Sequence, residues 1–179
     1  MFWRKKKNSS INQKPSKLQN ALALSREKKH IEAYPLFEEL YNENKNATNT
    51  FNLFQCAVYC NQIEVEKKLY EKLKCYSPNI KKEPMELSGC FVRCYYGFIL
   101  CDVNRNEEAV EIVEYLINVI SNYSVTDPTF LYIRGIPSAQ MVYDLIKKTF
   151  INNKEALNKY KNKLYSLLDY DTKKHNFID

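Results

Sequence analysis

The chain has 179 residues, enough for one domain or one short repeat array, and its 45% hydrophobic content is ordinary for a globular protein. Only 3 residues are Gly, which argues against sheet-rich folds with tight hairpins and against nucleotide-binding folds with glycine-rich phosphate loops. The formal net charge of +6 resides in the six cations of residues 1–17, so the rest of the chain is neutral and nucleic-acid binding is disfavoured.

This charge distribution divides the chain into three regions. We predict a basic flexible tail over residues 1–15, a helical-hairpin repeat domain over residues 16–170 and a frayed tail over residues 171–179. Residues 1–7 join aromatics to cations, as an interfacial membrane anchor does. Weak membrane contact, and less so nucleic-acid contact, is therefore the alternative to a disordered or body-packed tail.

The cellular compartment follows from what the sequence lacks. No apolar run reaches the ~18 residues of a membrane span. No apolar stretch follows the charged start, as it does in a secretory leader. Six cysteines without such a leader indicate reduced thiols, so a cytoplasmic protein is expected.

Apolar residues recur at the three- and four-residue spacing of α-helices in eight segments. Ser16 precedes the first segment, and Gln19 follows it three positions later, which is the pattern of a capping box. Pro35 falls inside the second segment, where it can delay or kink the helix. The predicted helices span about residues 17–28, 30–44, 51–59, 63–76, 85–101, 107–122, 138–151 and 154–169.

Two regions refine the predicted architecture. Segment 85–101 is apolar on nearly all sides, which predicts a central helix covered on more than one face. Segment 123–136 is the longest irregular stretch, in which Asp127 and Pro128 can start a short helical turn that Gly135 ends. No alternating strand pattern competes. The predicted fold is therefore all-α, with about eight helices as four stacked antiparallel hairpins.

Helix pairs of this length suggest repeats of about 34 residues, and one pair carries a local motif. The motif is the run Tyr96-Gly97-Phe98, then Asn104, then Glu107-Glu108-Ala109. Gly97 precedes Ala109 by twelve positions, and Ala21 precedes Ala33 by the same distance. This spacing resembles the tetratricopeptide repeat, in which small residues at these two positions let the paired helices cross closely.

The resemblance covers about residues 17–122 and is architectural. Phe37 stands where the family places an aromatic, but Val65 or Glu66 occupies the Ala position of the second hairpin, and the fourth offers only Ala156. The resemblance implies a right-handed array whose concave surface, lined by the first helix of each pair, holds a peptide or another protein. Such folds host many functions, so the function must come from a site.

The cysteines raise the question of a metal site. Cys56 and Cys60 are four positions apart, as are Cys90 and Cys94, and together they invite a four-cysteine zinc site. The turns after the two pairs come at different distances, so the two helices do not share a register. Core packing is the better prediction, and no metal or cofactor is expected. The same core role is predicted for Cys75 and Cys101.

The sequence lacks the motifs of common catalytic machineries, such as HExxH, a nucleophile elbow or a phosphate-binding loop. Its two histidines, His30 and His175, lie at a predicted turn and in a tail. The carboxylate pairs Glu38–Glu39 and Glu107–Glu108 are adjacent, so their members do not face each other on a helix. We therefore predict a non-enzymatic protein that binds another protein and no small-molecule substrate.

Charge and aromatic residues suggest where that partner binds. Residues 102–127 are rich in acids, whereas residues 147–174 carry eight Lys against three acids. Solvated helix faces explain this pattern, and charge complementarity to a partner is the functional alternative. The predicted partner-binding residues are Gln55, Tyr59, Phe98 and Asp102 on the concave side, with Phe130, Tyr132 and Arg134 on the 123–136 connector.

Two classes of binding protein fit these predictions. The more specific is an immunity protein that binds and neutralises a cognate bacterial toxin. Its repeats have drifted from the family consensus, as expected if selection follows one protein surface rather than a generic peptide. The alternative is a general tetratricopeptide-type adaptor or chaperone for a secretion or envelope complex. A third reading is a peripheral membrane or nucleic-acid-associated protein that acts through the basic N-terminal tail.

Overall fold

The computed structural model describes residues 15–79, 81–127 and 129–168. Within them lie eight α-helices, two short 3₁₀-helices and no β-strand, so the all-α prediction is confirmed. The β-type contact in this part of the chain is an isolated bridge between Val125 and Leu168. Both predicted tails lie outside the described residues except for Pro15, and so does the membrane contact predicted for residues 1–7.

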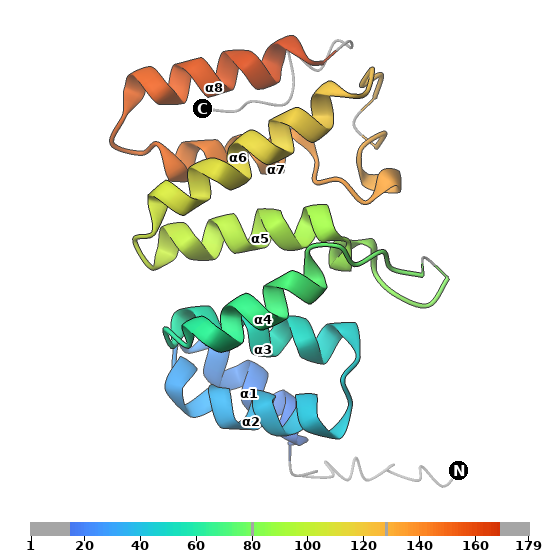
Figure 1. Cartoon of the computed structure of the whole chain (residues 1–179), viewed down its shortest axis with the longest axis vertical. Helices are drawn as coiled ribbons and strands as arrows, with labels where there is room; N and C mark the ends of the chain where they lie inside the picture. The colour runs from blue at the N-terminus through green and yellow to red at the C-terminus, as the bar shows by residue number, and fades with distance from the viewer. Residues whose placement is uncertain (1–14, 80, 128, 169–179) are drawn as a thin grey trace, which may run out of the picture.

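Each predicted helix has a counterpart in the structure. The elements are α1 (Lys17–Arg26), α2 (His30–Glu43), α3 (Ala47–Tyr59), α4 (Ile63–Leu73), η1 (Met85–Leu87), α5 (Gly89–Asp102), α6 (Asn106–Ser121), η2 (Tyr132–Arg134), α7 (Ala139–Thr149) and α8 (Lys154–Ser166). Along the long axis, α1 and α2 lie at one end, followed by α3 and α4, then α5, then α6 and α7 at about the same level, and α8 at the other end (Figure 1). No helix among the described residues is long and apolar enough to cross a membrane.

Side-chain caps set the starts of several helices. Ser16 and Gln19 form the predicted capping box, in which each side chain accepts a hydrogen bond from the other residue's backbone N–H. Ser88 caps α5 by accepting from the N–H of Phe91. The prediction of a single helix from residue 85 is therefore wrong: Met85–Leu87 form the separate element η1, because the extended backbone of Ser88 interrupts the helix.

Three of the turns between helices share one backbone geometry. Lys28, Asn61 and Asn104 have φ of 60°, 55° and 62°, and each occupies the middle of a three-residue turn. In each turn the next residue donates its N–H to a carbonyl five positions back, as Lys29 to Leu24, Gln62 to Ala57 and Arg105 to Leu100. Asn tolerates this left-handed conformation better than Lys does, so the turn at Lys28 is the strained one of the three.

The helix α5 is central, as predicted, and contacts α3, α6 and α7. A Cβ atom at Gly97 would lie 2.9 Å from Cδ2 of Leu145 in α7 and 3.3 Å from Cγ2 of Ile112 in α6. The glycine therefore makes room for both neighbours, whereas the tetratricopeptide resemblance implied a need for space only at α6.

One prediction about the cysteines is wrong. Cys75 is exposed, because α4 ends at Leu73, before the predicted end at residue 76, and the linker to η1 carries Cys75 away from the helix. Cys101 is half-buried, and its Sγ lies 3.5 Å from Oγ1 of Thr149.

Candidate protein-binding groove

A depression of about 530 Å³ lies at the edge of the array where α1, α3 and α5 end. We call it the groove, and its lining residues are Ser25, Arg26, Lys28, His30, Gln55, Tyr59 and Asp102. The predicted partner-binding residues Gln55, Tyr59 and Asp102 are therefore brought together. Three of its lining residues occupy equivalent positions, because Arg26, Tyr59 and Asp102 are the last residues of α1, α3 and α5.

Tyr59 is held in a fixed orientation at the centre of the groove. Its ring stacks on the His30 imidazole with centroids 4.0 Å apart and planes 8° from parallel. Its hydroxyl donates to Oδ2 of Asp102 over 3.1 Å. Burial, followed by the charge of Asp102, raises the pKa of Tyr59 to about 12, so the hydroxyl keeps its proton at neutral pH. A rigid aromatic with a polar tip is a favourable contact residue in protein interfaces.

Asp102 connects three helices at this edge. Its Oδ1 accepts a hydrogen bond from Nζ of Lys148 in α7 over 2.5 Å, while Oδ2 accepts from Tyr59 in α3. The same Lys148 ammonium lies 5.9 Å from the ring centroid of Phe98, the fourth residue predicted for this side. Phe98 is half-buried next to the groove rather than lining it. These contacts balance the charge of Asp102 inside the molecule.

Other polar groups of the groove are left without such partners. Within the described part of the chain, no acid lies within ion-pair distance of Arg26 or Lys28. Nδ1 of His30 is buried and makes no hydrogen bond to a described residue. Burial, and next the charge of Lys28, lowers the pKa of His30, so the imidazole is neutral at physiological pH. The groove thus presents two free cations beside a neutral ring.

The other three predicted residues lie on the connector between α6 and α7. Tyr132 donates its hydroxyl to Oε1 of Glu86 over 2.9 Å, and its ring meets that of Phe91 edge-on at 5.9 Å. The Arg134 guanidinium lies 3.7 Å from the ring centroid of Phe130 and also donates to the Phe130 carbonyl. Phe130, Tyr132 and Arg134 therefore make their main polar and ring contacts within the fold.

The connector and the groove are separate surfaces. Phe91, which contacts the connector, and Asp102, which lines the groove, are eleven residues apart on α5. The rise of an α-helix puts them about 16 Å apart along its axis. The seven predicted residues thus fall into two groups at opposite ends of α5, and whether either group binds a partner stays a prediction.

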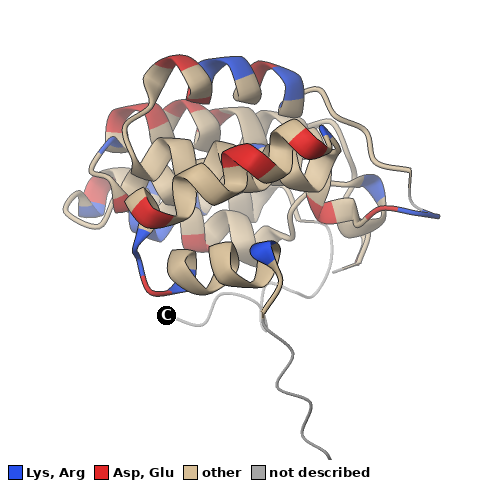
Figure 2. Cartoon of the chain, turned by 90° about the horizontal axis from the view of Figure 1, so that it is seen from below, with Lys and Arg blue, Asp and Glu red and all other residues tan. Residues whose placement is uncertain are grey.

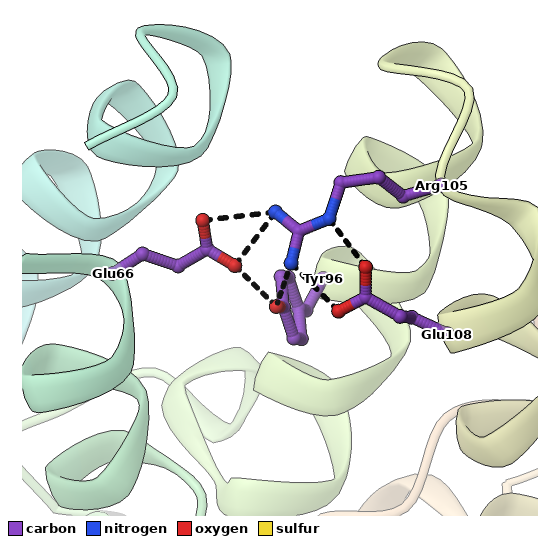
Figure 3. A network of polar contacts seen from close by, with 4 residues as sticks. All are labelled: Glu66, Tyr96, Arg105 and Glu108. Carbon is purple, nitrogen blue, oxygen red and sulfur yellow. Dashed lines mark hydrogen bonds and ion pairs between the residues drawn. The ribbon is translucent and has the colours of Figure 1, made fainter. Parts of the chain in front are cut away.

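A polar cluster near the middle of α5 runs from the buried Glu66 and Tyr96 to the exposed Glu108 (Figure 3). The buried Glu66 of α4 accepts from the Tyr96 hydroxyl over 2.5 Å and lies 2.8 Å from Nη1 of Arg105. Arg105 also makes two bonds, of 2.5 and 2.6 Å, to Glu108. The hydrogen bonds to Glu108 raise the pKa of Arg105 further against the opposing effect of burial, and the electrostatic interaction with Tyr96 and the bond to Glu66 add to the rise. This cluster fastens α4 to α5 and α6 and leaves no group free for a ligand.

The four cysteines considered for zinc pack into or against the core. Cys56 and Cys94 are buried, while Cys60 and Cys90 are half-buried. Burial raises the pKa of Cys56 to about 12 and raises that of Cys94 as well, which disfavours the thiolate that a metal requires. Among residues 15–168, leaving aside 80 and 128, no group of three His, Cys, Asp or Glu residues is placed to hold a metal.

Charges of both signs are distributed over the array. Figure 2 shows cationic and acidic residues interspersed along the described helices seen in this view. The acidic and basic segments of the sequence contact each other, since Asp102 pairs with Lys148 and Glu114 accepts from the Tyr160 hydroxyl over 2.6 Å. Part of their charge is therefore neutralised within the molecule.

Sequence reasoning missed Ser25, Arg26, Lys28 and His30 as groove residues, and it missed Lys148 as the partner of Asp102. One signal was available, because Arg26 ends its helix as Tyr59 and Asp102 end theirs, and Lys148 is one residue from the end of α7. Aligning the helix ends rather than the small-residue motif would have placed all four at one edge.

Comparisons of the chain with protein-family models, with curated proteins and with solved structures find no match. The tetratricopeptide resemblance therefore stays a prediction, without support from a relative. The functional inference rests on the groove and on the contacts that its residues make or leave unmade.

Proposed function

We propose that this chain is a non-enzymatic protein-binding module whose groove holds a segment of a partner protein. The observation that carries the proposal is that a fixed aromatic, Tyr59, lines the groove together with two cations, Arg26 and Lys28, that have no acid partner among the described residues. Rigid aromatics contribute contact area at low entropic cost, and unpaired polar groups gain when a partner satisfies them.

The rigidity of the groove favours one dedicated partner. Promiscuous binding surfaces are flexible and often rich in Met, so that they can repack around many ligands. Here the Tyr59 ring is stacked on His30, and Asp102 is bonded to both Tyr59 and Lys148. We therefore propose as the specific function an immunity protein that binds and neutralises one cognate bacterial toxin in the cytoplasm.

A general adaptor or chaperone for a secretion or envelope complex is the second candidate. The openness of the groove at the edge of the array favours it, because an extended peptide can enter from solvent without unfolding the array. An adaptor binds many extended peptides weakly, whereas an immunity protein binds one folded toxin tightly.

The test uses the product of the neighbouring gene as the candidate partner. The full chain is co-expressed with it, growth is measured, and the purified pair is titrated by calorimetry. Tight 1:1 binding with rescue of growth supports immunity. Micromolar binding that is shared by many unstructured peptides, without rescue of growth, favours the adaptor function instead.

Two matched variants locate the binding surface. Tyr59→Ala removes the half-buried groove aromatic, and Tyr132→Ala removes an exposed aromatic from the connector at the other end of α5. We expect Tyr59→Ala to weaken partner binding by about 2 kcal/mol or more, as at an interface hot spot, and Tyr132→Ala to leave it nearly unchanged. Circular dichroism checks that both variants fold. The reverse pattern would move the binding site to the connector.

A further inference from the structure

We infer that the groove recognises carboxylate side chains, so that the partner segment bound there carries Asp or Glu. This inference rests on the proposed function and specifies its ligand chemistry. It depends on which charges of the groove are already satisfied within the molecule and which are not.

The acids near the groove are already occupied. Glu27 pairs with Lys29 over 2.7 Å, and Asp102 pairs with Lys148 over 2.5 Å while also accepting from Tyr59. Arg26 and Lys28 have no acid at ion-pair distance among the described residues. The uncompensated charge of the groove is therefore positive, and a carboxylate is the protein group that complements it.

Lys28 occupies a position that suits Lys poorly. Its left-handed φ of 60° matches that of Asn61 and Asn104 in the two equivalent turns, where Asn tolerates the conformation. Of these three turns, only the one after α1 has a long cation at this position, and that cation lines the groove. Strained backbone at a binding surface is a known feature of functional sites, and here it holds an ammonium at the groove.

A neutral donor completes the site. The Gln55 side chain lines the groove and carries an amide NH₂ that can donate. The His30 ring, fixed by its stack on Tyr59, forms part of the groove wall, and its buried Nδ1 is not accessible to a partner. Together with Arg26 and Lys28, the Gln55 amide can bind the oxygens of one or two carboxylates.

A polyanion such as nucleic acid fits the groove less well. The carbonyl ends of α1, α3 and α5 bring partial negative charge to this edge, which opposes any anion. Two cations beside Asp102 can offset this charge for one or two separate carboxylates but not for a continuous polyanion. Nucleic-acid binding needs an extended basic face, whereas charges of both signs are interspersed along the described helices seen in Figure 2. An acidic protein segment, with separate carboxylates between uncharged residues, matches the groove better.

The test uses a short fluorescent peptide rich in Glu and Asp and its counterpart in which every acid is replaced by the matching amide. Binding to the full chain is measured by fluorescence anisotropy. Arg26→Gln with Lys28→Gln removes the two groove cations, and Lys81→Gln with Lys82→Gln removes two exposed cations of the linker before η1 as the matched control. The His30 imidazole resonance, assigned with His30→Gln, reports contact at the groove.

We expect the acidic peptide to bind at least about tenfold more tightly than the amide peptide. The Arg26→Gln/Lys28→Gln variant should lose about tenfold in affinity, and the control less than about twofold, because exposed ion pairs contribute up to about 1 kcal/mol each. The His30 resonance should shift only with the acidic peptide. Equal binding of both peptides, or equal losses in both double variants, would overturn the inference.

The same variants separate this inference from the proposed function. If the cognate partner binds Arg26→Gln/Lys28→Gln with an unchanged Kd while Tyr59→Ala loses binding, the carboxylate inference fails and the groove remains the binding site. If neither Arg26→Gln/Lys28→Gln nor Tyr59→Ala changes the Kd for the partner, the groove is not the binding site, and the carboxylate inference fails as well.

Discussion

The two ends of α5 use the same kinds of residue for different purposes. At its N-terminal end, Tyr132 is bonded to Glu86, and the Ser88 hydroxyl donates to the carbonyl of Gly135, so the connector is fastened to the helix. At its C-terminal end, Arg26 and Lys28 have no acid partner within the described residues. The first end is used to build the fold, and the second leaves groups available to bind.

This difference teaches that residue type alone does not identify a binding surface. Tyr132 is more exposed than Tyr59, and Arg134 is exposed as Arg26 is, yet Tyr132 is bonded to Glu86 and Arg134 to the Phe130 carbonyl. What distinguishes the groove from the connector is that its aromatic lies beside two cations, Arg26 and Lys28, that have no acid partner among the described residues. The following expectations test that distinction, beginning with the largest effect.

The largest effect is expected at the N-terminal end of α5. A Cβ atom at Gly89 would lie 2.1 Å from the Lys74 carbonyl oxygen, so Gly89→Ala forces the backbone apart. We expect a loss of about 2–3 kcal/mol in the free energy of unfolding, since overpacking outweighs the ~1 kcal/mol that Ala gains over Gly in a helix. Urea unfolding followed by circular dichroism measures it.

Gln55→Ala is the matched change at the groove end. Because Gln55 contributes to the groove rather than to the core, we expect a change within about 0.5 kcal/mol. Comparable losses in the two variants would show that both ends serve the fold equally.

The cluster between the two ends should behave as part of the fold. Glu66→Gln removes the ion pair of Arg105 with the buried Glu66 and leaves its ion pair with Glu108. We expect a loss of about 2 kcal/mol, less than for a fully buried pair because Arg105 is partly exposed. Glu64→Gln, an exposed acid on the same helix, is the control and should cost less than about 0.5 kcal/mol. If Glu66→Gln left the free energy of unfolding unchanged, the cluster would not contribute to the stability of the fold.

A gain in stability is expected at the groove. Lys28→Asn gives the strained turn the residue that Asn61 and Asn104 supply in the other two. We expect about 0.5–1 kcal/mol of added stability together with weaker binding of the acidic peptide. Thermal unfolding and anisotropy on the same sample measure both effects. If Lys28→Asn added stability but left binding of the acidic peptide unchanged, the strained turn would not contribute to binding.

The smallest effect concerns pH. Since burial lowers the pKa of His30 in the folded state, the unfolded chain takes up the proton first as the pH falls through its ordinary pKa of about 6.5. Stability should therefore decrease between about pH 7.5 and 6, and His30→Gln should remove part of that slope. The change is small because the ring is partly exposed. Parallel melting curves for both proteins over this range would contradict the expectation.

Local chemistry predicted much of this structure. The Ser16–Gln19 capping box and the turn ended by Gly135 were readable because each depends on neighbouring residues only. The start of α5 was misplaced because apolar residues continue through Met85–Leu87, and only the backbone at Ser88 separates the two helices. Cys75 was misassigned for a similar reason, since α4 stops at Leu73 without a Pro or Gly signal there.

The groove was only partly predictable. Gln55, Tyr59 and Asp102 were found because the first helices of successive pairs were expected to share a surface. Arg26 and Lys28 were missed because no local pattern reports whether a cation has a partner from another helix. The pairing of Lys148 with Asp102, 46 positions apart, likewise depends on how α5 packs on α7.

Hydrogen–deuterium exchange of the full chain, alone and in complex with its cognate partner, tests the central claim most directly. The groove account predicts slower exchange on binding in residues 24–30, 55–60 and 98–103, with residues 130–135 unchanged. Protection confined to residues 130–135, with the groove segments exchanging as in the free protein, would contradict it.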